Sequence, residues 1–192
     1  MRPVFERSLE QAEDLLRVFR ADPATLDAME RIGALLATAF RGGHKALACG
    51  NGGSMADAMH FAEEFSGRFR LDRPPYAALA LSDPAHMSCV ANDYGYDVVF
   101  SRQVEALGKP GDVLLVLSTS GNSPSLLRAA EAARTRGVAV VGLLGRGGGA
   151  LRALCDVVLM AHGEGSDRIQ ELHMLALHMI IEAVEGEIEG SR

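Results

Sequence analysis

Hydrophobic and polar positions divide the chain into short apolar runs and longer amphipathic stretches that alternate along its length. Each apolar run is too short for a helix but long enough for a strand buried on both faces. The stretches between the runs carry apolar residues at three- and four-residue spacing, which is typical of helices with one buried face. We therefore expect strands at 45–49, 77–81, 113–117, 138–143 and 156–161, and helices at 8–19, 25–41, 55–69, 84–91, 98–107, 125–135 and 167–187.

This alternation predicts the fold class. Strands joined through helices form a parallel sheet covered on both faces, so we expect a three-layer α/β protein of flavodoxin- or Rossmann-like type with 113–117 as a central strand. Two amphipathic helices precede the first strand, and we expect part of their apolar surface to pack against another subunit. The length predicts a single domain over 1–192, with a helical N-terminal segment at 1–43 and an α/β core at 44–192.

Two turns rich in glycine and hydroxyl groups follow predicted strands. One is Gly-Asn-Gly-Gly-Ser at 50–54, and the other crowds the hydroxyls of 118–123 around Gly121, before a Ser-Pro pair that favours a helix start. In a parallel sheet these turns, and a polar turn expected at 92–96, meet at the carboxyl edge of the strands. Either turn alone is equally consistent with an ordinary loop. Together they favour a phosphate monoester, held by helix N-termini.

Known nucleotide-binding motifs do not explain these turns. No Gly-Lys-Ser/Thr follows the first one, and Met55 stands where a G-x-G-x-x-G pattern needs glycine. The stretch 145–150 formally fits G-x-G-x-x-A, but the next strand follows too soon for a dinucleotide-binding unit. We read it as a flexible turn.

Composition and charge limit the expected partners. A formal net charge of -6 without clustered Lys and Arg argues against a nucleic-acid surface. No window approaches 18 consecutive apolar residues and the N-terminus lacks a stretch of signal type, so we expect a cytoplasmic protein without membrane contact. The three cysteines, Cys49, Cys89 and Cys155, are widely spaced and odd in number, which favours buried free thiols.

Four side chains on two predicted helices could hold a divalent cation. His60 and Glu64 are four residues apart and share a helix face, while Gln170 and His178 lie on the last helix. A pair such as His60 and Glu64 is more often a solvated ion pair, and His178 among apolar residues is more often a core histidine. As a set, the four fit zinc best. Gln170 and His178 are about 12 Å apart along the helix, so we expect neighbouring chains to contribute to the site.

Five segments together resemble the phosphoheptose isomerases, which have the sugar isomerase (SIS) fold: 48–54, 57–65, 88–93, 117–123 and 167–171. The resemblance covers nearly the whole chain. It implies an aldose–ketose isomerase that converts sedoheptulose 7-phosphate to D-glycero-D-manno-heptose 7-phosphate, the first step of ADP-heptose supply for the lipopolysaccharide core. It also implies a homotetramer with sites at its interfaces and one zinc ion per subunit.

The resemblance assigns roles to individual residues. Glu64 would be the base and His178 the acid that move a proton through an enediolate, and His60, Glu64, Gln170 and His178 would bind zinc. Arg68 and Asp167 would be further polar groups near the substrate. The implied substrate contacts are Asn51, Gly52, Gly53, Glu64, Asn92, Asp93, Ser118, Thr119, Ser120, Ser123 and Gln170.

Two alternatives share this fold. One is a non-catalytic phosphosugar-binding regulator, of the type that binds the replication initiator protein, which need not keep Glu64 and His178 together. The other is a SIS enzyme for a different sugar phosphate, such as an amino-sugar or arabinose phosphate. A short single domain that carries both the His60/Glu64 and the Gln170/His178 pairs favours the phosphoheptose isomerase.

Overall fold

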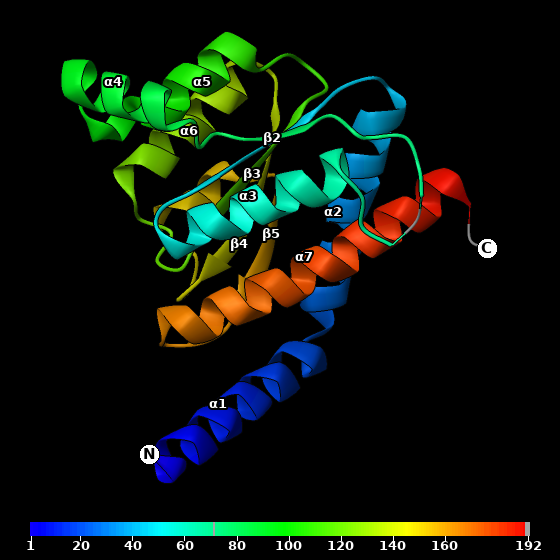
Figure 1. Cartoon of the computed structure of the whole chain (residues 1–192), viewed down its shortest axis with the longest axis vertical. Helices are drawn as coiled ribbons and strands as arrows, with labels where there is room; N and C mark the ends of the chain where they lie inside the picture. The colour runs from blue at the N-terminus through cyan, green and yellow to red at the C-terminus, as the bar shows by residue number, and fades with distance from the viewer. Residues whose placement is uncertain (71, 191–192) are drawn as a thin grey trace.

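A five-stranded parallel sheet forms the centre of the computed structural model, which describes residues 1–70 and 72–190 (Figure 1). Its strand order is β2-β1-β3-β4-β5, so the run predicted as a central strand is central. Almost every residue of the inner strands β1, β3 and β4 is buried, whereas the edge strands β2 and β5 are partly exposed. The strands are β1 (Ala46–Gly50), β2 (Ala78–Ala80), β3 (Val113–Ser118), β4 (Ala139–Gly145) and β5 (Val157–Ala161).

Helices cover both faces of the sheet, which confirms the three-layer α/β prediction. One face packs against α2 (Pro23–Arg41), α3 (Gly53–Ser66) and α7 (Ser166–Glu189). The opposite face packs against α4 (Pro84–Tyr94), α5 (Val99–Leu107) and α6 (Pro124–Thr135). Alternate residues of β3 point to the two faces, with Leu115 in the first cluster and Leu114 in the second. Short 3₁₀ turns, η1 (Tyr96–Val98) and η2 (Ala150–Leu154), complete the described elements.

The first helix, α1 (Arg2–Ala21), extends away from the rest of the chain (Figure 1). Phe19 is its only buried residue, whereas Phe5 and Leu9 are 63% and 70% exposed. Asp22 separates α1 from α2, and its side chain accepts a hydrogen bond of 2.9 Å from the backbone N–H of Ala24. The two N-terminal helices therefore differ: α2 packs on its own sheet, while α1 leaves most of its apolar face uncovered.

Several sequence expectations about local structure are wrong: α1 begins at Arg2 rather than at residue 8, and α3 ends at Ser66 rather than at residue 69. Residues 92–94 are not a turn but the last turn of α4, which ends where Gly95 takes a positive φ of 94°. The three cysteines are free, as expected, but Cys89 is exposed and only Cys49 is fully buried. Among the described residues, no helix has both the length and the apolar character needed to cross a membrane.

Candidate functional site

A polar hollow of about 240 Å³ lies at the carboxyl edge of the sheet, beyond β1 and β3. Both turns that the sequence singled out line it, and the start of α7 closes it. The expected meeting of the two turns is therefore confirmed. Ligands of parallel α/β sheets bind at this edge. The hollow is lined by Asn51, Ser54, Leu117, Ser118, Thr119, Ser120, Ser123, Leu126, Ser166 and Gln170.

Three helices begin at this hollow, and none of them has a side-chain cap. The N-cap positions are Gly52 for α3, Ser123 for α6 and Gly165 for α7. Ser123 thus occupies the predicted N-cap position, but its hydroxyl makes no capping bond. Uncapped helix starts offer backbone N–H groups and the positive ends of helix dipoles. A phosphate monoester suits this surface, because the hydroxyls around it can donate further hydrogen bonds.

Close contacts within and between the loops fix the shape of the hollow. Gly121 has a φ of 67°, and a Cβ at this position would overlap the backbone carbonyl of Gly148. The Gly121 N–H donates to the hydroxyl of Ser118 at 2.9 Å, which closes the turn after β3. These contacts bring the loops after β3 and β4 together, and only glycine fits where they meet.

Asn51 is held on both sides of its amide. Its Nδ2 donates to the hydroxyl of Ser125 at 3.1 Å, and its Oδ1 accepts a hydrogen bond of 2.9 Å from the hydroxyl of Tyr96. Sequence reasoning missed Tyr96, Ser125 and Ser166. Tyr96 stood within the expected polar turn and was visible only as part of it.

Three candidate metal ligands converge on the outer faces of α3 and α7. His60 Nε2 lies 3.0 Å from Glu64 Oε1 and 3.2 Å from His178 Nε2. One ligand atom from each residue can be chosen so that all three lie within 4.8 Å of one another. Two imidazoles and a carboxylate are a donor set that suits zinc. The ring of Phe69 stacks on His178 at 5.7 Å between centroids and covers one side of the group.

The three residues meet because α3 and α7 run side by side in the same direction. At the start of the pair, Gln170 Nε2 donates to the Ser54 hydroxyl at 3.4 Å, and further along His178 meets His60. A single chain brings His60, Glu64 and His178 together, and the contribution of a neighbouring chain to the site stays a prediction. The predicted separation of Gln170 from His178 along α7 is present, since His178 lies in the group with His60 and Glu64 while Gln170 does not. Gln170, the fourth candidate ligand, lines the hollow instead.

Asp57 is a further acidic group on α3, one turn before His60. Burial raises its pKa to about 6, and the nearby His60 acts in the opposite direction. One of its carboxylate oxygens, Oδ2, is buried without a hydrogen-bond partner among the described residues.

The remaining predicted site residues do not line the hollow. Asn92 and Asp93 are exposed at the end of α4, where the Asn92 amide donates to Asp93 at 2.7 Å. Arg68 is exposed just beyond the end of α3. Asp167 lines a different hollow, together with residues of α1. The glycines lie at the start of α3: Gly52 is its N-cap, and a Cβ on Gly53 would come within 2.7 Å of the Gln170 amide.

The chain is similar to known proteins in sequence and in overall structure. Residues 9–145 match the SIS domain family. The chain is 51% identical to a phosphoheptose isomerase from Serratia proteamaculans over 181 residues, which is 94% of each chain. Phosphoheptose isomerase GmhA from Neisseria gonorrhoeae has a similar structure, with a TM-score of 0.90, 35% identity and coverage of 96% of this chain and 98% of that one. A phosphoheptose isomerase from Francisella tularensis gives 0.85, 34% and 95% of each chain.

Proposed function

We propose an activity for this chain from its family: it belongs to the phosphoheptose isomerases, proteins with a SIS domain. The chain interconverts sedoheptulose 7-phosphate and D-glycero-D-manno-heptose 7-phosphate as an aldose–ketose isomerase. The observation that carries this proposal is the meeting of His60, Glu64 and His178 on the two helices whose N-termini face the polar hollow. One end of these helices suits a phosphate, and the acid, base and metal ligands lie further along them.

The residues divide the reaction between them. The phosphate ester binds in the hollow through helix N-termini and through the hydroxyls of Ser118, Thr119, Ser120 and Ser123. Glu64 takes the proton next to the carbonyl and returns it to the neighbouring carbon, while His178 serves the oxygens as acid and base. His60, Glu64 and His178 would hold zinc, and Gln170 would be a fourth ligand once its amide turned from the hollow towards them. The bound ion would supply Lewis-acid stabilisation of the negative charge that develops on those oxygens.

We propose the same substrate-contact set as the resemblance implies, including the residues outside the hollow. Asn92, Asp93, Arg68 and Asp167 would need a movement of the chain, or a neighbouring subunit, to reach the sugar. Asn51 and the glycines Gly52 and Gly53 already stand at the turn after β1. The catalytic pair and the phosphate hollow therefore need no such movement.

The reaction itself is the direct test. Purified protein loaded with zinc is incubated with sedoheptulose 7-phosphate, with and without a chelator, and the aldose is measured. We expect aldose formation that the chelator abolishes. The variant Glu64→Gln should lower turnover by roughly 10²-fold or more, the scale of lost general-base catalysis, while the phosphosugar still binds. The adjacent exposed Glu63→Gln is the control, and absence of aldose from the loaded wild-type chain would contradict the proposal.

The product of the reaction indicates the biosynthetic pathway in which this enzyme takes part. A heptose 7-phosphate made here would start the supply of ADP-heptose for the lipopolysaccharide core. The charged phosphate ester does not cross a lipid bilayer unaided, so we place the enzyme in the cytoplasm with its substrate.

The alternative of a non-catalytic regulator is not favoured, because relatives that are 50–51% identical to this chain are named as isomerases.

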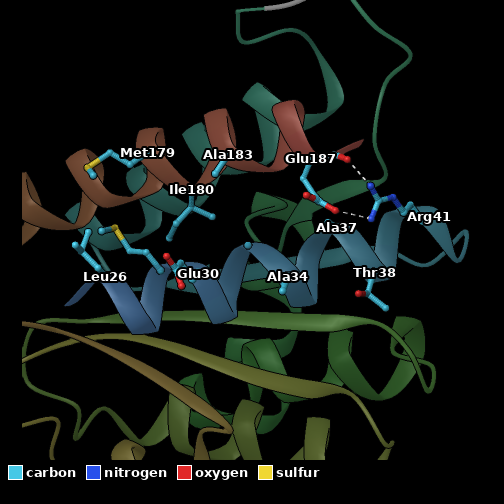
Figure 2. Close-up of a pocket in the computed structure, with 12 residues that line it drawn as sticks. Leu26, Glu30, Ala34, Ala37, Thr38, Arg41, Met179, Ile180, Ala183 and Glu187 are labelled. Carbon is cyan, nitrogen blue, oxygen red and sulfur yellow. Dashed lines mark hydrogen bonds and ion pairs between the residues drawn. The ribbon is translucent and has the colours of Figure 1, made fainter. Parts of the chain in front are cut away.

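We also propose a homotetramer, in which α1 of one copy covers a groove on another. The groove, about 500 Å³ in volume, lies between α2 and α7 (Figure 2). Figure 2 shows Leu26 and Ile180 from the two helices facing it, while Arg41 and Glu187 join at one end. Small residues along the groove, among them Ala34, leave space for a helix. The exposed apolar face of α1 supplies a partner with matching character.

Sedimentation equilibrium tests this assembly. The double variant Phe5→Glu/Leu9→Glu places charges on the uncovered face of α1 and should yield a smaller assembly than the wild type. Glu13→Gln on the same helix should leave the mass unchanged. An unchanged mass for the double variant would exclude α1 from the interface.

A further inference from the structure

Arg73 lies in the segment after α3, and its side chain is completely buried. Its Nη2 donates to the backbone carbonyl of Glu64 at 2.9 Å, and its Nη1 donates to the carbonyl of Phe65 at 2.9 Å. On the other side, Nε donates to Glu185 Oε1 at 2.7 Å. The guanidinium also lies over the ring of Tyr76, at 4.1 Å from the centroid. One buried cation therefore binds the end of α3 and a carboxylate of α7 at the same time.

The two carbonyls belong to the last turn of α3. Carbonyl groups in the last turn of a helix have no N–H partner within the helix and need one from outside. Positive charge is favourable at this end, because the helix dipole places partial negative charge there. Arg73 meets both requirements at the residue whose side chain faces the histidines. The backbone of Glu64 is thus fixed by a contact that leaves its carboxylate free to face His60.

Glu185 fixes the same guanidinium to the helix that carries His178. Seven residues separate the two on α7, which places them on one face of the helix two turns apart. Only 2% of the Glu185 side chain is exposed, and its second oxygen, Oε2, accepts a bond of 3.2 Å from the backbone N–H of Arg70. Neither partner of this ion pair can shift easily, because an unpaired buried charge is costly.

We propose that Arg73 is a positioning residue for the isomerase reaction, which sets the separation of Glu64 from His178 by holding the end of α3 against α7. The proposal rests on the isomerase function proposed above. Arg73 does not line the hollow, and its described contacts include neither the Glu64 carboxylate nor His178; it acts through the carbonyls of Glu64 and Phe65 and through Glu185. A displacement of about 1 Å at a catalytic group can lower the rate about 10²-fold, so the loss of this contact should affect turnover.

The test must separate positioning from simple stabilisation. The double variant Arg73→Met/Glu185→Leu removes both charges and keeps apolar volume, a replacement that is often neutral for stability. Its thermal midpoint, kcat, KM for sedoheptulose 7-phosphate and zinc affinity are measured, the last by competition with a chromophoric chelator. We expect kcat to fall about 10- to 100-fold and zinc affinity to fall by about the same factor, the range seen when groups that orient metal ligands are lost. KM should change less than twofold.

Arg73→Lys provides a second variant that keeps the charge. An ammonium cannot reproduce the planar fork that reaches both carbonyls and Glu185, so we expect the same loss of kcat and of zinc affinity. It decides the question if the double variant does not fold.

Arg136, an exposed arginine that also binds a carbonyl at a helix end, provides a control. Its Nε donates to the carbonyl of Gly108 at 3.2 Å, just beyond α5 and on the opposite face of the sheet. Arg136→Met should lower the thermal midpoint and leave kcat and zinc affinity unchanged.

Wild-type kcat and zinc affinity in folded Arg73 variants would overturn the proposal. If the wild-type chain forms no aldose, the proposed function fails, and the zinc measurements still decide whether Arg73 positions Glu64. A loss of zinc affinity that Arg136→Met does not share supports the positioning role in either case.

Discussion

The Nε2 atoms of His60 and His178 lie 3.2 Å apart, although 118 residues separate the two in sequence. At this distance one neutral imidazole can donate its N–H to the nitrogen of the other, or both nitrogens can bind the same cation. Glu64 Oε1, 3.0 Å from His60 Nε2, adds negative charge at the same point and favours the cation. The geometry thus supports a metal site more strongly than the spacing of His60 and Glu64 alone.

The first prediction concerns metal binding. The wild-type chain should bind one equivalent of zinc. His60→Gln should lower the zinc affinity at least about 100-fold, since the loss of a direct ligand should cost at least as much affinity as the loss of a group that orients one. Competition with a chromophoric chelator measures the affinity. His162→Gln is a suitable control, because His162 is exposed and faces Asp22 at 3.3 Å. Equal zinc affinity in the wild type and His60→Gln would refute the site.

The second prediction concerns Tyr96 and the turn after β1. Tyr96→Phe removes only the hydroxyl that donates to Asn51 Oδ1 at 2.9 Å. A bond of this kind is worth about 0.5–1.5 kcal/mol, so KM should rise about two- to tenfold as the turn loses its orientation. Turnover should stay near the wild-type value. Tyr94→Phe on the preceding helix is the control, and an unchanged KM for Tyr96→Phe would show that Asn51 needs no such support.

Much of the fold could be predicted from the sequence because the strands are apolar along their whole length. The run at 113–117 indicated burial on both faces, and the central position of β3 follows from that burial. The end of α4 could not be predicted in this way. Asn92 and Asp93 favour turns by composition, yet the helix continues through them until Gly95, whose N–H bonds to the carbonyl of Ala91.

The candidate site likewise has one part that could be predicted from the sequence and another that could not. Loops that follow parallel strands must meet at one edge, so the hollow could be predicted from topology alone. The contact of His60 with His178 depends on how α3 and α7 pack, and no spacing within either helix reveals it. The role of Arg73 could not be predicted from the sequence, because an arginine in a polar segment is normally exposed. Its burial becomes evident only from its four hydrogen-bond partners in the structure.

The third prediction concerns Gly121, where the loops after β3 and β4 meet. Gly121→Ala places a Cβ on the carbonyl of Gly148, so the two loops must separate. We expect KM to rise at least about tenfold and stability to fall by more than the roughly 1–2 kcal/mol that an L-residue loses at a positive φ. Gly147→Ala is the matched control, since its φ of 82° gives the same strain without any atom within 4 Å of the new Cβ. Similar KM values for the two variants would contradict this reading.

The fourth prediction uses His173, which is fully buried on α7 between that helix and the sheet. Burial lowers its pKa from 6.5 to about 4, because the charged ring would lose its hydration, and the Leu144 backbone opposes this shift only weakly. Between these two pKa values, His173 therefore binds a proton in the unfolded chain but not in the folded chain. His173 contributes full stability above about pH 6.5 and progressively less as the pH falls towards 4.

The loss should approach about 3 kcal/mol at pH 4, at about 1.36 kcal/mol for each unit of pKa shift. His173→Leu removes the titrating group and keeps an apolar side chain, so its stability should fall less than that of the wild type between pH 6.5 and 4. Denaturant unfolding of both proteins at pH 7, 5.5 and 4.5 measures the difference, in which the other titrating groups cancel. Equal pH dependence for His173→Leu and the wild type would mean that the folded chain accepts a proton on His173.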